Sequence, residues 1–501
     1  MRLSLYFESK PEEFINLLER GVVSLQEAIY VYNLFKDSWR NSNYLKRKII
    51  HKLFYTIVKI VKADSKFNDV QLLVELFDGD VDFCYDLLES KYVEFDFPVV
   101  FANSSVDQNN AGSLVRGLVV FTRKLFTNMP EKKDAIENVM RLSGKSFSVI
   151  FDSDFVGNSF VLSLYIAVSL EKFFDDLTFT GELTIDKKIL PADKLDTKEK
   201  ISRLFNKKLI SHFDLSTGDV SEILELLSSK RLRVPVLLSY TDKRNDPAIL
   251  PKSYEKLLSA TSSIHSRNLF EKLLGERLLY QKNYIKPGEF VREIISANTL
   301  LHKILARNWI PHIAIDGPAS FAFGLGVCFG IHNPVVVYQF QSGNYYYCTL
   351  DLSDNPRKIR SQKVSIDNLT KIYFREIAEL DKGEDIIFVI HLSTMDPTPD
   401  VINFARESKI SSKGILISHK SAGNIDIGNW LDEVTEIYSV IDYVRTKFRF
   451  KKAHFFLNMP VSIAFGIGMA LGHFIQGVVY SYNADDPEAK YYEAFKFIDL
   501  M

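Results

Sequence analysis

The chain has few of the residues that build metal centres or disulfide frameworks. Its 501 residues include three cysteines, Cys84, Cys328 and Cys348, which lie too far apart in sequence to suggest a metal-binding pair or a disulfide pattern. The ten histidines are scattered, and no HExxH motif occurs. We therefore predict that the chain binds no metal and works in a reducing environment.

Strong charge of one sign is also lacking. The 62 lysines and arginines nearly balance the 63 aspartates and glutamates, which leaves a formal net charge of −1. Proteins that bind duplex nucleic acid carry a broad basic surface, so this balance argues against that class but allows a small anionic ligand in one pocket.

Long hydrophobic runs are missing as well. The longest apolar runs are about a dozen residues, short of the roughly 20 that span a bilayer. Residues 1–10 contain no apolar core of the kind found in a signal peptide. We predict a cytoplasmic protein without a membrane partner.

Apolar residues are plentiful, at 46%, and the length predicts roughly two to four domains. Residues 1–94 are predicted to be helical, since apolar side chains between Ile50 and Val61 recur at helical spacing. We interpret this region as a packing or substrate-docking module.

A second region, residues 95–245, has the pattern of an α/β domain. Strands are predicted over 97–101, 146–151 and 234–240, with a helix over 114–126. A polar, proline-punctuated stretch over 242–251 marks its end. A third domain is predicted over 255–501, opening with a helix over 254–280.

The last third contains an internal repeat. The run from His312 to Gly326 matches the run from His454 to Gly468, and the match continues without a gap to Tyr338 and Tyr480. Each copy is typical of a strand, a tight turn, a small-residue helix and a second strand. We predict two similar α/β halves, around 285–345 and 385–483.

The chemistry is predicted to lie between Gly157 and Lys200. Ser159 precedes a long apolar run, residues 160–170, which predicts a serine at the first turn of a buried helix. Unpaired N–H groups at a helix start support an attacking serine and a developing oxyanion. A downstream lysine serves as the base only when burial lowers its pKa from about 10.4. Taken singly, Ser159 is equally well explained as a helix cap, and Lys198 and Lys200 as solvated charges.

These residues resemble the proteolytic domain of the Lon family. Gly157-Asn158-Ser159 is similar to the nucleophile motif of that family, and Thr180-Gly181-Glu182-Leu183-Thr184 to its conserved strand. Leu190-Pro191, followed by a helix that carries lysines, is similar to its base-bearing block. The resemblance implies that Ser159 is the nucleophile, Lys200 its general base, and Thr180 a partner of the lysine.

Three alternatives stay open within this region. Asp193-Lys194 replaces the usual paired glycines, and two extra residues precede the run from Lys198 to Lys200. Lys198 and Lys194 therefore remain rival bases, and Ser153 a rival nucleophile.

The duplicated Pro-x-Ser-x-Ala-Phe-Gly-x-Gly blocks resemble the halves of a SAVED domain, which joins two CARF-like Rossmann units and senses cyclic oligonucleotides. Such ligands bind beyond the carboxyl ends of parallel strands and near helix N-termini. Trp309 is equally explained as a core residue, and the glycines by close helix–sheet packing. The residues expected to bind the ligand are Trp309, Asp316, Ser320, Ser393, Thr394, Lys420, Asn458 and Ser462.

The fused pair resembles the CRISPR-associated Lon–SAVED proteases of type III antiviral signalling. The implied fold class is multidomain α/β, with an N-terminal helical region, a Lon-type α/β protease domain and a C-terminal SAVED domain. No Walker motif occurs, so the ATPase motor of the Lon family is missing and control must come from elsewhere.

The resemblance also implies how the protease is controlled. Cyclic tetra-adenylate is the expected activator, although catalysis needs no cofactor. The expected partners are a protein substrate encoded nearby and further copies of the chain, assembled by the cyclic oligoadenylate. The alternatives are a non-catalytic sensing scaffold and a ring nuclease that degrades the ligand.

Overall fold

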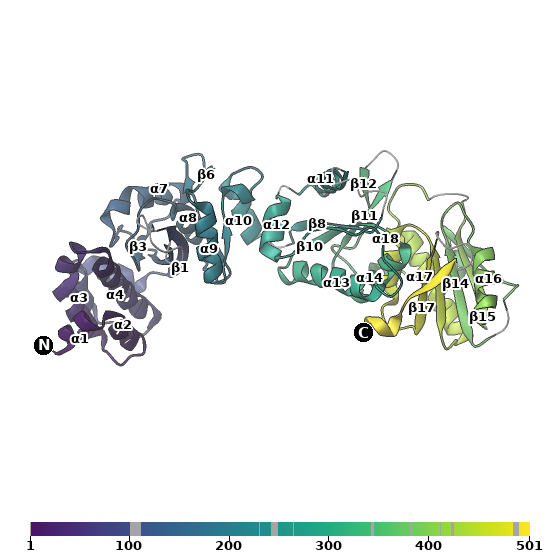
Figure 1. Cartoon of the computed structure of the whole chain (residues 1–501), viewed down its shortest axis with the longest axis horizontal. Coiled ribbons are helices and arrows are strands. Elements are labelled where there is room, and N and C mark those ends of the chain that lie inside the picture. The colour runs from purple at the N-terminus through teal and green to yellow at the C-terminus, as the bar shows by residue number, and fades with distance from the viewer. Residues whose placement is uncertain are drawn as a thin grey trace. The chain divides into compact units, whose positions relative to one another are not determined.

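The computed structural model describes residues 2–100, 112–229, 231–241, 249–263, 265–341, 345–380, 383–410, 412–421, 425–483 and 490–501. The chain forms two compact units, Met1–Ser228 and Ser229–Met501 (Figure 1). Among the residues described, every helix is too short or too polar to cross a membrane.

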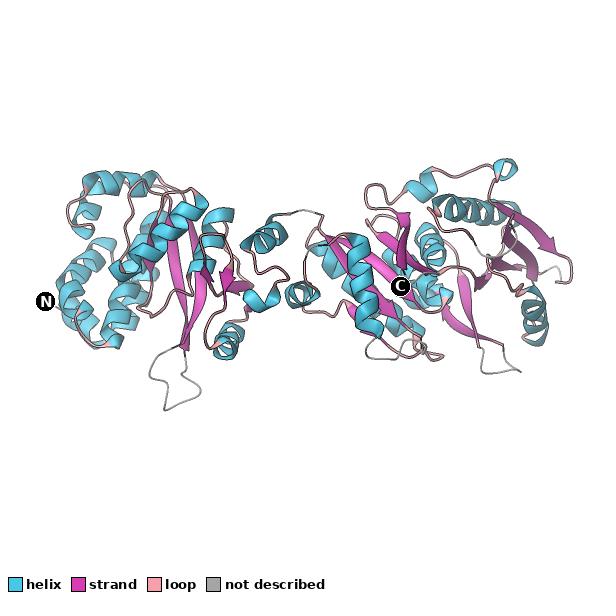
Figure 2. Ribbon diagram, turned by 90° about the horizontal axis from the view of Figure 1, so that it is seen from above, coloured by secondary structure: helices cyan, strands magenta, loops and turns pink. Residues whose placement is uncertain are grey.

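Helices fill residues 2–89, as predicted, and they lie beside the N mark in Figure 2. Side-chain caps fix where two of them begin: Ser24 Oγ accepts the backbone N–H of Glu27, and Asn43 accepts that of Lys46. The helices are α1 (Arg2–Ser9), α2 (Pro11–Glu19), α3 (Leu25–Arg40), α4 (Tyr44–Ala63), α5 (Val70–Leu76) and α6 (Val81–Glu89).

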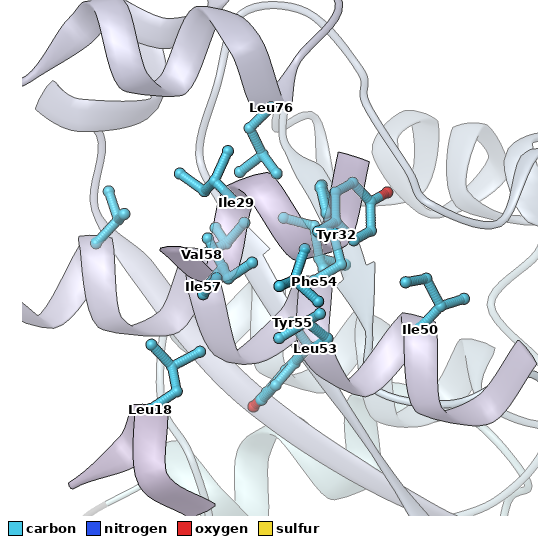
Figure 3. Close-up of a cluster of buried hydrophobic side chains, with 14 of the residues drawn as sticks. Leu18, Ile29, Tyr32, Ile50, Leu53, Phe54, Tyr55, Ile57, Val58 and Leu76 are labelled. Carbon is cyan, nitrogen blue, oxygen red and sulfur yellow. The ribbon is translucent and has the colours of Figure 1, made fainter. Parts of the chain in front are cut away.

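These helices share one apolar core with the strands that follow them. Leu53, Phe54 and Ile57 of α4 pack against Ile29 and Tyr32 of α3 (Figure 3). The same buried cluster continues into Leu118 and Val120 of β2 (Gly112–Val120) and Ile150 of β3 (Ser148–Phe151). The helical region predicted to end at residue 94 is therefore continuous with the α/β part.

The rest of the first unit is α/β. Strands β1, β2 and β3 form an antiparallel sheet, β4 and β7 pair in parallel, and β5 pairs with β6. The remaining elements are β1 (Tyr92–Val100), η2 (Pro130–Lys132), α7 (Lys133–Ser143), α8 (Val161–Leu170), β4 (Leu177–Phe179), β5 (Glu182–Leu183), β6 (Ile189–Leu190), α9 (Leu195–Leu204), β7 (Lys208–Ile210), η3 (His212–Asp214) and α10 (Val220–Ser228).

The helix predicted over 114–126 is wrong, because most of that stretch is strand β2. It pairs with β1 along its whole length. Gly117 faces the Phe95 ring so closely that a Cβ atom there would lie 2.2 Å from it. The valines of this stretch are β-branched and favour a pleated strand over a helix.

The first half of the second unit contains a sheet of order β12-β11-β10-β8-β9. Its strands are parallel except for β12 at one edge. The elements are β8 (Arg233–Ser239), α11 (Ile249–Thr261), α12 (Arg267–Leu274), β9 (Leu279–Gln281), α13 (Phe290–Ala306), β10 (Ile310–Asp316), α14 (Ala319–Phe329), β11 (Val336–Gln341) and β12 (Tyr345–Asp351).

Two predicted boundaries are corrected by this sheet. Strand β8 pairs with β10 from Arg233 to Ser239, so it belongs to the second unit and not to a domain that ends at residue 245. The helix predicted over 254–280 is instead two helices and strand β9. The first half therefore begins well before residue 285.

The second half repeats this topology in a sheet of order β13-β15-β14-β16-β17-β18. Strands β14, β16, β17 and β18 correspond to β8, β10, β11 and β12. The elements are α15 (Lys358–Ser361), η5 (Ile366–Asn368), β13 (Ile372–Ile377), β14 (Asp385–His391), α16 (Thr398–Glu407), β15 (Ser412–His419), α17 (Leu431–Phe448), β16 (Ala453–Asn458), α18 (Val461–Leu471), β17 (Gly477–Tyr482), β18 (Tyr491–Lys496) and η6 (Phe497–Leu500).

The two halves meet through helices α14 and α18. A Cβ atom on Gly326 would lie 2.1 Å from the carbonyl oxygen of Phe465, and one on Gly468 would lie 2.1 Å from that of Phe323. These are equivalent positions of the repeat, so the contact is nearly symmetric. The expected helix–sheet role is wrong for Gly326 and Gly468, which bring two helix backbones together.

Candidate functional site

Ser159 lies in the turn that leads into helix α8. The carbonyl of Ser159 accepts the N–H of Gly181 at 3.0 Å, and the N–H of Leu162 donates to the carbonyl of Gly181 at 3.1 Å. Helix α8 is buried from Val161 to Val168, so its start is held against the core. These two bonds fix the Ser159 turn beside the segment that contains Thr180.

The side chain of Lys198, on helix α9, contacts the segment that contains Thr180. Its side chain is 6% exposed, and Nζ donates a hydrogen bond to Thr180 Oγ1 at 3.2 Å. Thr180 is the neighbour of Gly181, which is bonded to Ser159. The structure therefore brings the Ser159 turn, Thr180 and Lys198 into one neighbourhood.

Burial changes the acid–base behaviour of this lysine. Desolvation lowers the pKa of Lys198, because the charged ammonium is disfavoured away from water. The negative charges of Asp193 and Glu182 oppose that shift. A lowered pKa increases the neutral fraction, which is the form that accepts a proton.

The other residues considered from the sequence lie elsewhere. The structure places Lys200 on the exposed side of α9 and Lys194, also exposed, at its N-cap. Ser153 is buried after β3, and its hydroxyl donates to the carbonyl of Asp154 at 3.4 Å. Of the three lysines considered, Lys198 is the one that is buried beside Thr180, two positions before Lys200 on the helix.

Sequence reasoning missed Lys132, at the end of η2. Its Nζ donates to the carbonyl of Gly157 at 2.9 Å, and the side chain is 6% exposed. No motif marks this lysine, because it precedes Ser159 by a helix and a strand. The only hint is Pro130, which predicts a turn there.

A second group of polar residues ends the strands of the C-terminal unit. His391, the last residue of β14, is the register partner of Asn458, the last residue of β16. His419 ends the neighbouring strand β15. Asn458 Nδ2 donates to the carbonyl of Met395 at 2.6 Å, and this bond holds the loop that contains Ser393 and Thr394.

The first half has an equivalent row. Ser239, Asp316 and Gln281 end β8, β10 and β9, and Ser239 is the register partner of both others. Tyr346 donates to Asp316 Oδ2 at 3.4 Å. The two halves thus present matching polar rows at their carboxyl edges, where ligands of parallel sheets bind.

Several side-chain atoms at these edges are buried without a hydrogen-bond partner in the described parts of the chain. They are Ser239 Oγ, His391 Nδ1 and His419 Nε2. Ser239 and His391 were not predicted from the sequence to face a ligand, although each is polar at the end of an apolar strand. Lys420 lies beside His419 and donates to the carbonyl of Leu369.

Three of the predicted ligand residues are placed differently. Ser320 and Ser462 are buried between the halves: the Ser320 hydroxyl donates to Ser481 Oγ at 3.1 Å, and that of Ser462 to Gln339 Oε1 at 3.3 Å. Trp309 is 4% exposed and precedes β10, at the amino end of the strand. It therefore lies at the edge opposite Asp316.

Over the described ranges, no group of three or more histidine, cysteine, aspartate or glutamate side chains is arranged to hold a metal ion.

Residues 297–497 match the family model SAVED, described as the SMODS-associated and fused to various effectors sensor domain. The C-terminal unit therefore contains a SAVED domain, as the duplicated blocks predict. No curated protein matches the sequence.

Solved structures of two Cap4 SAVED/CARF-domain containing receptors are similar to this chain. The Acinetobacter baumannii receptor with the cyclic trinucleotide 2'3'3'-cAAA is 12% identical, with a TM-score of 0.33, over 74% of this chain and 78% of that chain. The Moraxella osloensis receptor is 10% identical, with a TM-score of 0.31, over 80% and 94%. Similarity at this level does not extend the assignment beyond the matched residues.

Proposed function

We propose that the SAVED domain of the C-terminal unit controls a serine protease in the first unit. The observation that carries the catalytic half of this proposal is Lys198, buried against Thr180 beside the Ser159 turn. The match to a sensor domain over residues 297–497 supports the regulatory half.

In the proposed reaction, Ser159 Oγ attacks the scissile carbonyl while the neutral amine of Lys198 takes its proton. Backbone N–H groups of the Ser159 turn stabilise the oxyanion, since those of Val161 and Leu162 already donate to the carbonyls of Asn158 and Gly181. The Lys198 ammonium then gives its proton to the leaving amine, and an acyl-serine remains. Water attacks this ester with Lys198 again as the base, which releases the second product and restores Ser159.

Thr180 positions the base in this scheme. Its Oγ1 accepts a hydrogen bond from Lys198 Nζ, so the amine is held on the side of Gly181 and Ser159. Burial supplies the lowered pKa that a lysine base needs near neutral pH. Lys198 takes the place of Lys200, whose exposure keeps its ammonium hydrated.

The proposed activator is a cyclic oligoadenylate, and cyclic tetra-adenylate is the ring size to test first. Its site includes the carboxyl-edge rows that end in Asp316 and Asn458, with Ser393, Thr394 and Lys420 nearby. Imidazole, amide and hydroxyl groups at these strand ends provide donors and acceptors for base edges and phosphates. We propose that ligand-induced assembly of several copies then activates the protease against a specific protein.

The test compares the full chain with Ser159→Ala. Both are incubated with cyclic tri- and tetra-adenylate and with proteins encoded beside the chain, and ligand binding is measured by calorimetry. We expect ligand-dependent cleavage by the unchanged chain only, with equal ligand affinity for both. Cleavage by Ser159→Ala at the normal rate would place the nucleophile elsewhere.

A further inference from the structure

A cavity of about 530 Å³ lies next to the loop that contains Ser159. One wall comes from the N-terminal helices, through Arg40 of α3 and through Arg47 and His51 of α4. Lys132 and the loop that begins at Asp154 form the other wall. The helical region thus contributes directly to a cavity beside the proposed nucleophile.

Lys132 is the buried cation of this cavity. One of the three donors of its ammonium bonds the carbonyl of Gly157 at 2.9 Å, and Nζ lies 4.9 Å from the centre of the Phe155 ring. Glu131, Asp154 and Glu182 act on this ammonium through their charge, but within the part of the chain that the structure describes none of them forms an ion pair with Nζ. Two donors are therefore left for a group that enters the cavity.

The remaining charges of the walls do not neutralise this cation. Arg47 is paired with Asp154 at 2.8 Å. Burial lowers the pKa of His51 to about 4, so its ring is uncharged at neutral pH, and Nδ1 is bonded to the side chain of Asn128 at 2.8 Å. Two cations of the lining, Arg40 and Lys132, then remain against one carboxylate, Glu131. The net charge of the lining is therefore positive.

The cavity is also close to the proposed reacting groups. Gly157, whose carbonyl Lys132 holds, precedes Ser159 by two residues, so their Cα atoms are at most about 7 Å apart. Burial lowers the pKa of Lys132, as it lowers that of Lys198, and the charge of Glu182 opposes both shifts, which places one carboxylate near both lysines. Val156, which lines the cavity, precedes Ser159 by only three residues.

We infer that this cavity receives the side chain of the substrate residue on the acyl side of the cleaved bond, and that Lys132 selects aspartate or glutamate there. This inference rests on the proposed protease function. A carboxylate accepts hydrogen bonds from the remaining donors of Lys132 and gives the buried ammonium a directly bonded counter-charge. A basic residue would bring a second cation into the same space.

Peptidyl diphenyl phosphonates test this selection, because they label an active serine and differ only in the residue beside phosphorus. We expect the glutamate probe to label Ser159 of the activated full chain at least about tenfold faster than the glutamine probe, as a hydrogen-bonded charge pair predicts. In Lys132→Met this ratio falls to about one. Lys133→Met is the matched control, because Lys133 is exposed and its ratio stays unchanged.

The ratio of the two labelling rates distinguishes a loss of glutamate selection from structural damage. A disturbed Gly157 turn slows both probes equally and leaves the ratio unchanged. Equal labelling by both probes, or a ratio unchanged in Lys132→Met, would overturn the inference and leave the protease proposal intact. Failure of every probe to label Ser159 would count against the protease itself. In that case, fluorescence anisotropy of glutamate and glutamine peptides on Ser159→Ala still decides, because the inference requires tighter glutamate binding that Lys132→Met abolishes.

Discussion

Lys198 Nζ lies 3.2 Å from Thr180 Oγ1, and Thr180 adjoins the glycine that is hydrogen-bonded to Ser159. This relationship connects helix α9 to the start of helix α8 through one short segment. The lysine is buried there, whereas Lys200 on the same helix is exposed. Because only the amine of Lys198 is buried beside Thr180, we propose that Lys198 and not Lys200 acts as the base.

Replacing Lys198 by methionine is expected to reduce the labelling of Ser159 by a fluorophosphonate by about 100-fold or more, the usual range for loss of a general base. Lys200→Met serves as the matched control from the exposed face of the same helix, and its rate stays close to that of the unchanged chain. Intact-mass spectrometry over time measures both rates. The reverse pattern would restore Lys200 as the base.

The pH dependence of labelling follows from the pKa of Lys198. The reaction needs the neutral amine, so the rate falls as the pH drops below the folded-state pKa. Since Glu182 raises the pKa of Lys198, the substitution Glu182→Gln lowers it and moves the ascending limb of the pH–rate profile to lower pH. A profile that moves to higher pH, or does not move, would show that Lys198 is not the titrating group.

Alanine at Gly326 or Gly468 is expected to destabilise the C-terminal unit by about 1–3 kcal/mol or more, because its methyl group meets a backbone carbonyl across the helix pair. Gly428→Ala is the control, since nothing lies within 4 Å of its added Cβ. Urea unfolding followed by circular dichroism measures the difference. Equal stability of all three variants would contradict the close approach of α14 and α18.

Ligand binding should distinguish the two ends of the parallel strands. Asn458→Ala removes the bond to the Met395 carbonyl, and we expect a roughly three- to tenfold weaker affinity for the cyclic oligoadenylate. Trp309→Phe, at the amino end of β10, leaves the affinity unchanged. Calorimetry of the full chain gives both values, and weaker binding only in Trp309→Phe would move the ligand site to the opposite edge.

Much of the C-terminal unit was predictable because its sequence contains an internal repeat. The runs that begin at His312 and His454 form β10 and β16, and the following small-residue runs form α14 and α18. Strand β8 was assigned to the wrong unit, since its partner β10 lies more than seventy residues further along the chain. Such long-range pairing leaves no local signal in an apolar strand.

The motifs around the candidate catalytic site did not determine which lysine is buried there. Ser159 and Thr180 were identified from their motifs, whereas the choice between Lys198 and Lys200 depended on where α9 begins. Residues two apart on a helix face different directions, so a small error in the start reverses which one is buried. Lys132 had no signal at all, because only folding brings η2 to the Gly157 carbonyl.

We propose that ligand binding to the SAVED domain switches on Ser159, and fluorophosphonate labelling of the full chain measures this switch. Intact-mass spectrometry is performed with and without cyclic tetra-adenylate, and with cyclic tri-adenylate as the alternative ring. We expect one added label, on Ser159, that forms rapidly only with an activating ring and is absent from Ser159→Ala. Labelling that is independent of either ring, or that persists in Ser159→Ala, would contradict it.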